Sequence, residues 1–157
     1  MVTVTTRRHP RTRSTAIARY LGIDYGTRRI GLAVSDPDGT IASPVTVIEH
    51  AGDPAAQSRR IITVAADYGA DAFVVGLPLN MDGTEGPQAL LTRNFAAALA
   101  DMSGFTVHFV DERLTSISAD EHLLDARLTR GKKKARRDAV AAQIILQSFL
   151  DDPARSK

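Results

Sequence analysis

The stretch that decides the fold is residues 20–36, YLGIDYGTRRIGLAVSD. Apolar residues run through both halves, and Gly26 and Thr27 lie between them, so we expect two strands, 21–25 and 30–35, joined by a tight turn. Asp24 lies inside the first apolar strand, where an ionised carboxylate is unfavourable unless a cation or hydrogen-bond donors meet it. Asp24 is therefore a candidate functional residue, although an aspartate here can also simply hydrogen-bond the turn.

The residues that follow predict an α/β fold. A turn at 37–39 and a strand over 41–48 extend the hairpin to three antiparallel strands. Residues 72–76 are apolar on both faces, which is typical of a parallel strand covered by helices, and a fifth strand is expected over 105–110. We expect a five-stranded mixed sheet, its first three strands antiparallel, flanked by helices.

Helix boundaries are marked by Asp, Ser, Pro and Gly residues. We expect helices over 53–69 and 87–104, a short helix over 118–127 and a last helix over 138–150. The basic run over 127–137 has no apolar period, so we expect it to be unstructured without a ligand. The expected inward-facing residues are Ile61, Ile62, Ala65 and Tyr68 in the first helix and Leu91, Phe95, Ala98 and Met102 in the second.

Composition excludes several classes of site. A chain of 157 residues suits one domain with a hydrophobic core. The absence of cysteine excludes disulfides, thiolate metal sites and cysteine nucleophiles, and a reducing cytosol fits it. No apolar run approaches the ~20 residues of a membrane span, so we expect a cytoplasmic protein with no membrane partner.

Charge is unevenly distributed along the chain. Residues 1–19 hold five Arg and no acid, and residues 127–137 hold seven basic residues and no acid. Residues 20–126 hold six Arg against fifteen Asp and Glu. An acidic body with basic segments suits binding to a polyanion, with carboxylates and metal held in the body. We expect a flexible basic segment over 1–19, a domain over 20–151 and a tail over 152–157.

Two further acids are placed to meet Asp24. Glu112 follows the fifth strand, where functional sites of parallel sheets gather, and its neighbour Asp111 must point the other way. Asp138 shares a helical stripe with Ala142, Ile145 and Phe149, so we expect it to face the sheet. Three converging carboxylates favour Mg²⁺ or Mn²⁺, and two such ions can activate water and stabilise a leaving oxygen. Alternatively, Glu112 pairs with Arg113 on the surface, and Asp138 only caps its helix.

Four stretches, in this order and spacing, resemble the YqgF/RuvX family: GIDYGTRRIGLAVSD, GLPLNMDGTEG, DERLTS and DAVAAQIILQSFL. The match runs from residue 20 to about residue 151. The resemblance implies a ribonuclease H-like fold, related to Holliday junction resolvases of the RuvC kind, and a nuclease that processes the 5′ end of pre-16S ribosomal RNA. Resolution of four-way DNA junctions is the rival activity. The resemblance also implies that Asp24, Glu112 and Asp138 are the catalytic, metal-binding acids.

Other residues are candidates for holding the substrate phosphates. The Gly-rich loop over 77–86 can bind a phosphate through backbone N–H groups, or it is an ordinary surface loop. Thr115 either contacts a phosphate or caps the next helix, and Arg28 and Arg29 are expected to be solvated in the hairpin turn. The candidate phosphate-binding residues are Asn80, Gly83, Thr84, Arg113, Thr115, Lys132, Lys133, Lys134 and Arg136.

The expected partner is nucleic acid, as structured RNA or branched DNA, with the ribosome precursor as one source and the protein as a monomer or homodimer. Two other classes remain open. Asp24, Tyr25, Gly26 and Gly31 also resemble the first phosphate loop of actin-like ATPases and sugar kinases, but those enzymes close two domains on a nucleotide. A non-catalytic nucleic-acid-binding module is the second alternative. The three acids argue against it, because carboxylates without a bound cation repel phosphate.

Overall fold

The computed structural model describes residues 18–50, 53–115 and 130–156, and for residues 130–136 and 156 it describes the backbone alone. The elements are β1 Tyr20–Tyr25, β2 Arg29–Ser35, β3 Ala42–Glu49, α1 Pro54–Asp67, β4 Ala72–Leu77, α2 Pro87–Ser103, β5 Thr106–Asp111, η1 Glu112–Leu114, α4 Arg130–Asp151 and η2 Pro153–Ser156. Each strand lies within one residue of its predicted range. No helix in the described ranges is long and apolar enough to cross a membrane.

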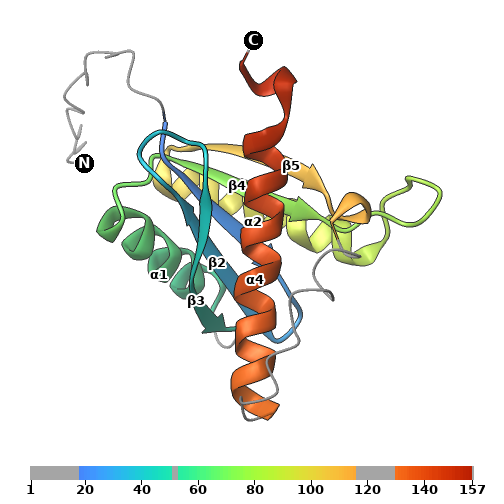
Figure 1. The fold of residues 1–157 in the computed structure, drawn as a ribbon. Helices are drawn as coiled ribbons and strands as arrows, with labels where there is room; N and C mark the ends of the chain where they lie inside the picture. Colours follow the sequence, from blue (N-terminus) through green and yellow to red (C-terminus); the bar gives the residue numbers. More distant parts are fainter. Residues whose placement is uncertain (1–17, 51–52, 116–129, 157) are drawn as a thin grey trace, which may run out of the picture.

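The five strands form one mixed sheet in the order β3-β2-β1-β4-β5 (Figure 1). β1 pairs antiparallel with β2, and β2 antiparallel with β3. β4 pairs in parallel with both β1 and β5. The α/β fold class and the antiparallel start of the sheet are therefore confirmed.

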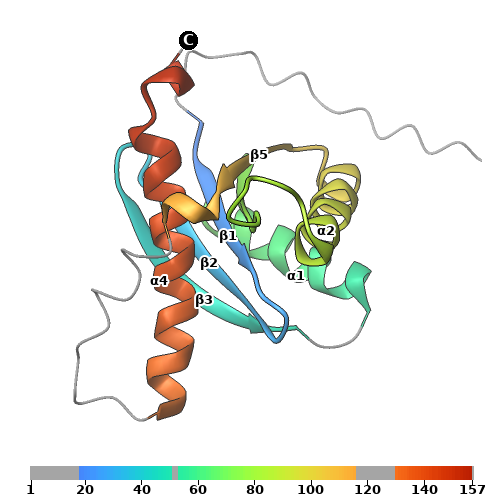
Figure 2. The same ribbon diagram turned by 90° about the vertical axis from the view of Figure 1, so that its right-hand side faces the viewer.

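Helices cover both faces of the sheet. α1 and α2 lie on one face and α4 lies on the other (Figure 2). Phe73 and Val75 of β4 pack into the core beneath α1 and α2, whereas Val74 packs into the core beneath α4. This double cover explains why β4 is an uninterrupted apolar run, because both of its faces are removed from water.

The ends of α1 and α2 follow the predicted signals, and Phe95 is buried as predicted, but Tyr68 of the first predicted stripe is exposed and so are the other three residues of the second. Asp53 caps α1 by accepting a hydrogen bond from the Ala55 N–H at 3.2 Å, and Gly104 ends α2 with a φ of 70°. Leu91, Ala98 and Met102 are exposed. The buried residues of α2 are Ala89, Thr92, Phe95, Ala96 and Leu99. The prediction weighted large apolar side chains, whereas the structure buries two alanines and a threonine beside Phe95 and Leu99, and the threonine hydroxyl bonds to its own helix.

The start of the last helix was also predicted wrongly. α4 begins at Arg130, so residues 130–137 of the basic run that we expected to be unstructured form its first turns. Lys, Arg and Ala are good helix formers, and extending a helix that is already packed costs little. The predicted stripe is correct in its buried part, because Ala142 and Ile145 pack on the sheet. The predicted helix over 118–127 and the segment over 1–17 lie outside the described residues.

Candidate active site

Asp24 lies near the end of the central strand, between two glycines. Asp24 pairs with Gly31 on β2. On the other side, the preceding residue Ile23 pairs with Val75 of β4, so the next residue of β4, Gly76, lies beside Asp24. Side chains alternate along a strand, so Asp24 shares a face with Gly22, whose neighbours are side-chain and backbone atoms of α4. Asp24 therefore projects toward α4 from a part of the sheet where its neighbours have no side chains.

Glu112 reaches the same place from the first residue of η1, directly after β5. Its side chain hydrogen-bonds that of Asp24. A Cβ on Gly76 would lie 2.6 Å from Glu112 Oε1 and 2.5 Å from Ile145 Cδ1, so the glycine leaves the space that the carboxyl group fills. Asp111 points elsewhere and accepts a 2.6 Å hydrogen bond from Arg113 Nη2. The structure thus brings Glu112, rather than Asp111, to Asp24.

Asp138 approaches from α4. A Cβ on Gly31 would overlap with the Asp138 carbonyl oxygen, so the helix backbone lies directly against β2. The carboxylate Oδ2 of Asp138 is 3.8 Å from Nη1 of Arg29. Asp138 is about two turns inside a helix that begins at Arg130, so the alternative that it caps the helix is wrong.

Burial and mutual repulsion perturb the acids. Burial, followed by the negative charge of Asp138, raises the pKa of Asp24 to about 6, although the hydrogen bond with Glu112 opposes this rise. Burial, followed by the charge of Asp24, raises the pKa of Glu112 to about 7. The two carboxyl groups therefore titrate as a pair that holds a proton close to neutral pH.

The three acids offer the oxygen ligands that Mg²⁺ and Mn²⁺ prefer. Asp24 and Glu112 are in contact, and Asp138 is close enough to change the pKa of Asp24. Among the described residues, however, no three acidic or histidine side chains are gathered tightly enough to hold a metal ion. The chemistry of the donor set fits a divalent cation, and the carboxylate of Asp138 lies within ion-pair distance of Arg29.

The Gly-rich loop after β4 is closed by its own hydrogen bonds. The Asn80 N–H bonds to the Thr84 carbonyl at 2.8 Å, and the Gly83 N–H bonds to the Asn80 carbonyl at 2.8 Å. The Thr84 N–H and hydroxyl both bond to the Asp82 carboxylate. The N–H groups of the three residues predicted to bind phosphate are therefore already used, which argues against a clamp built from them.

Arg113 and Thr115 also have partners within the protein. Arg113 Nε lies 3.1 and 3.0 Å from the two carboxylate oxygens of Asp111, and its Nη1 donates to the Met81 carbonyl at 3.3 Å. Arg113 thus ties the Gly-rich loop to the end of β5 and is not the surface partner of Glu112 considered above. The buried Thr115 hydroxyl bonds to the Glu112 carbonyl at 3.0 Å and so closes the turn that carries the acid.

Arg29 was missed by the sequence reasoning, which placed it in a solvated turn. It is instead the first residue of β2, and its side chain reaches Asp138. The sequence does contain a signal for this position. Arg29 lies two residues before Gly31, and residues i and i+2 of a strand share a face, so Arg29 is on the same face of the sheet as Gly31. Arg28 is exposed, as expected.

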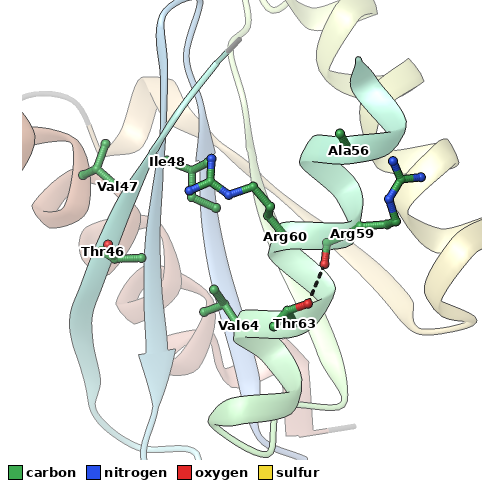
Figure 3. Close-up of a pocket in the computed structure, with 8 residues that line it drawn as sticks. All are labelled: Thr46, Val47, Ile48, Ala56, Arg59, Arg60, Thr63 and Val64. Atoms are coloured by element: carbon green, nitrogen blue, oxygen red, sulfur yellow. Dashed lines mark hydrogen bonds between the residues drawn. The ribbon is translucent and has the colours of Figure 1, made fainter. Parts of the chain in front are cut away.

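A groove of about 490 Å³ lies between β3 and α1 (Figure 3). Arg60 extends toward Ile48, whereas Arg59 points away from β3. Ile48 belongs to the core beneath α1 and α2, so the groove is on the opposite face of the sheet from the acids. The groove is therefore separate from the acid cluster.

Comparison with solved structures defines the class of fold. The chain is similar to Thermus thermophilus RuvC in complex with a Holliday junction substrate, with a TM-score of 0.52 and 14% sequence identity, over 89% of this chain and 96% of that one. A second structure of RuvC from the same organism matches with a TM-score of 0.51, at 16% identity over 84% of this chain and 93% of that one. The domain therefore has the expected ribonuclease H-like fold.

Comparison of sequences then shows the family. The model of the RuvX family, described as Holliday junction resolvase, matches residues 18–152. A Roseiflexus protein is 45% identical over 133 residues, 85% of this chain and 94% of its own length. A Myxococcus xanthus protein is 44% identical over 133 residues, 85% of this chain and 87% of its own length. Both are named, provisionally, as pre-16S rRNA nucleases. This chain belongs to the RuvX family, and the resemblance drawn from its four motifs is confirmed.

Proposed function

We propose that this protein is a divalent-cation-dependent nuclease that hydrolyses phosphodiester bonds during 5′-end processing of pre-16S ribosomal RNA. The observation that carries the proposal is the contact between the Asp24 and Glu112 carboxyl groups in a space left open by Gly76. A half-buried pair of acids with raised pKa values is unfavourable for folding alone, and such groups cluster at functional sites.

Each acid has a distinct task in this proposal. Asp24, on the central strand, and Glu112, on the turn after β5, would bind the cation from the sheet side, and Asp138 would bind it from α4. The bound cation would supply charge stabilisation for the phosphate and a water of lowered pKa. Thr115 holds the turn that presents Glu112, and Gly31 lets α4 bring Asp138 close.

Substrate contacts come from the basic start of α4. Its backbone is helical from Arg130, so Lys132, Lys133, Lys134 and Arg136 leave the same helix that carries Asp138. We propose that these cations bind phosphates of the nucleic acid on either side of the cut. We propose that the protein acts on this substrate in the cytoplasm.

Pre-16S ribosomal RNA is the favoured substrate because the similar proteins are named for it. Their similarity to this chain covers 85% of its residues. Resolution of four-way DNA is the second candidate, favoured by the description of the matching family model and by the fold shared with RuvC. The two candidates share the acid cluster and differ in the nucleic acid bound.

The experiment compares cleavage of a 5′-extended 16S precursor and of a four-way DNA junction by the pure protein, with Mg²⁺, with Mn²⁺ and with a chelator. Asp24→Asn should abolish cleavage, whereas the control Asp101→Asn should cleave as wild type does, because Asp101 is exposed at the far end of α2. Equal cleavage by wild type and Asp24→Asn would overturn the assignment of the site, and cleavage of the junction alone would select the second substrate.

A further inference from the structure

Arg29 is the basic residue that faces the acid cluster from β2. Its Nη1 is 3.8 Å from Asp138 Oδ2, which is within ion-pair range but beyond a hydrogen bond. That nitrogen is buried and has no hydrogen-bond partner in the described part of the chain. The exposed fractions of the two side chains, 25% and 26%, show that most of this pair is shielded from water, which weakens screening by solvent and salt.

Rigid elements set the distance between the two charges. Arg29 begins β2, a strand paired on both sides, and Asp138 lies inside α4. Gly31, two residues from Arg29, lets the backbone of α4 come down onto β2 at Asp138. The pair is therefore produced by the packing of a helix on a strand and not by the chance meeting of two mobile side chains.

The nearby arginine cannot take the same role. Arg113 is bound through its Nε and Nη2 groups to the carboxylate of Asp111. Without a cation, the cluster thus holds two acids that share a hydrogen bond and a third that is paired with Arg29.

We propose that Arg29 is a positioning residue that holds Asp138 in the metal-free protein and competes with the divalent cation for its carboxylate. The competition rests on the proposed function, whereas the ion pair itself does not. Binding of the cation and pairing with Arg29 are then linked, so each weakens the other by the same factor. Arg29 stabilises the empty cluster, and its presence lowers the affinity of the cluster for the cation.

The test measures thermal unfolding of the full chain without nucleic acid, with and without Mn²⁺, together with Mn²⁺ affinity from water-proton relaxation. Arg29→Gln should lower the melting temperature of the metal-free protein, enlarge the rise in melting temperature caused by Mn²⁺, and tighten Mn²⁺ binding about fivefold or more. Arg29→Lys keeps the charge and should stay close to wild type in all three. Arg28→Gln, at the exposed neighbouring residue, is the matched control and should change none of them.

A double-mutant cycle separates this inference from the proposed function. In an Asp138→Asn background, Arg29→Gln should no longer lower the metal-free melting temperature, because the partner charge is already gone. An equal fall in both backgrounds would overturn the ion pair, whatever the nuclease assays show. If Arg29→Gln does not fold, Arg29→Lys decides, and tighter Mn²⁺ binding by that variant would overturn the competition. Unchanged or weaker Mn²⁺ binding by folded Arg29→Gln would also overturn it.

Discussion

The backbone of Asp138 lies directly against Gly31, close enough that any side chain at residue 31 would overlap with the Asp138 carbonyl oxygen. Residues 31 and 138 are far apart in the sequence, and their contact brings α4 onto the strand next to Asp24. The position of one acid relative to another therefore depends on the absence of a single Cβ atom.

Gly31→Ala should consequently damage both stability and activity. The added methyl group meets backbone and not a flexible side chain, so α4 must shift, and overpacking of this kind costs about 1–3 kcal/mol. We expect a lower melting temperature and a large loss of cleavage. Gly86→Ala is a suitable control, because the nearest atoms to a Cβ there belong to the Asn80 side chain and begin at 3.3 Å. Equal effects of the two substitutions on melting temperature would contradict the tight contact.

The stability of the metal-free protein should fall as pH rises toward neutrality. Asp24 and Glu112 have folded-state pKa values of about 6 and about 7, above the ordinary values of 3.8 and 4.5. The folded protein therefore binds more protons than the unfolded chain over that interval. The contribution of the pair is fully present below about pH 4 and is lost as pH rises through about 7.

Thermal unfolding from pH 4 to pH 8 with a chelator would measure this effect, compared with Asp24→Asn, which cannot ionise at that position. We expect the difference in melting temperature between variant and wild type to grow in favour of the variant as pH rises. Mn²⁺ affinity should increase over the same interval, because the ligands must lose their protons. A difference that does not depend on pH would show that the pair does not titrate in this range.

Much of the cluster could be predicted because its signals are local. Asp24 could be identified because it is an acid inside an apolar strand. Glu112 could be chosen over Asp111 because neighbouring side chains of a strand point to opposite faces. Arg29 was missed because its partner is an acid from a distant helix, and the phase of α2 was missed because two alanines and a threonine share its buried face with Phe95 and Leu99. The start of α4 was missed because charge was taken as a sign of disorder, although the same residues favour a helix.

The position of Asp138 inside α4 predicts how two substitutions there will compare. A residue that capped the helix would lose about 1 kcal/mol when changed to Ala and little when changed to Asn. Inside the helix, Ala has the higher helix propensity, so Asp138→Ala should be at least as stable as Asp138→Asn. Both should lose cleavage by orders of magnitude. A markedly less stable Ala variant would restore a capping role.

The basic start of α4 predicts a change in the salt dependence of nucleic-acid binding. Replacing Lys132, Lys133 and Lys134 with Gln should preserve the helix, since Gln and Lys have similar helix propensities. It should weaken binding and reduce the slope of log affinity against log salt concentration. For every phosphate that the variant no longer neutralises, the slope falls by about 0.9 on duplex DNA and about 0.7 on single strands, because fewer counterions are released.

The matched control for this variant is Arg59→Gln with Arg60→Gln, which removes two positive charges at the groove on the other face of the sheet. Titrations at several salt concentrations, with Asp24→Asn in every protein to prevent cleavage, would compare the two variants. If the start of α4 holds the nucleic acid, only the lysine variant shows a reduced slope. Reductions in proportion to the charges removed, three in the lysine variant and two in the arginine variant, would show that binding responds to net charge alone, because long-range attraction does not depend on which face carries the charge. A reduction confined to the arginine variant would move the nucleic acid to the groove between β3 and α1 and away from the acids.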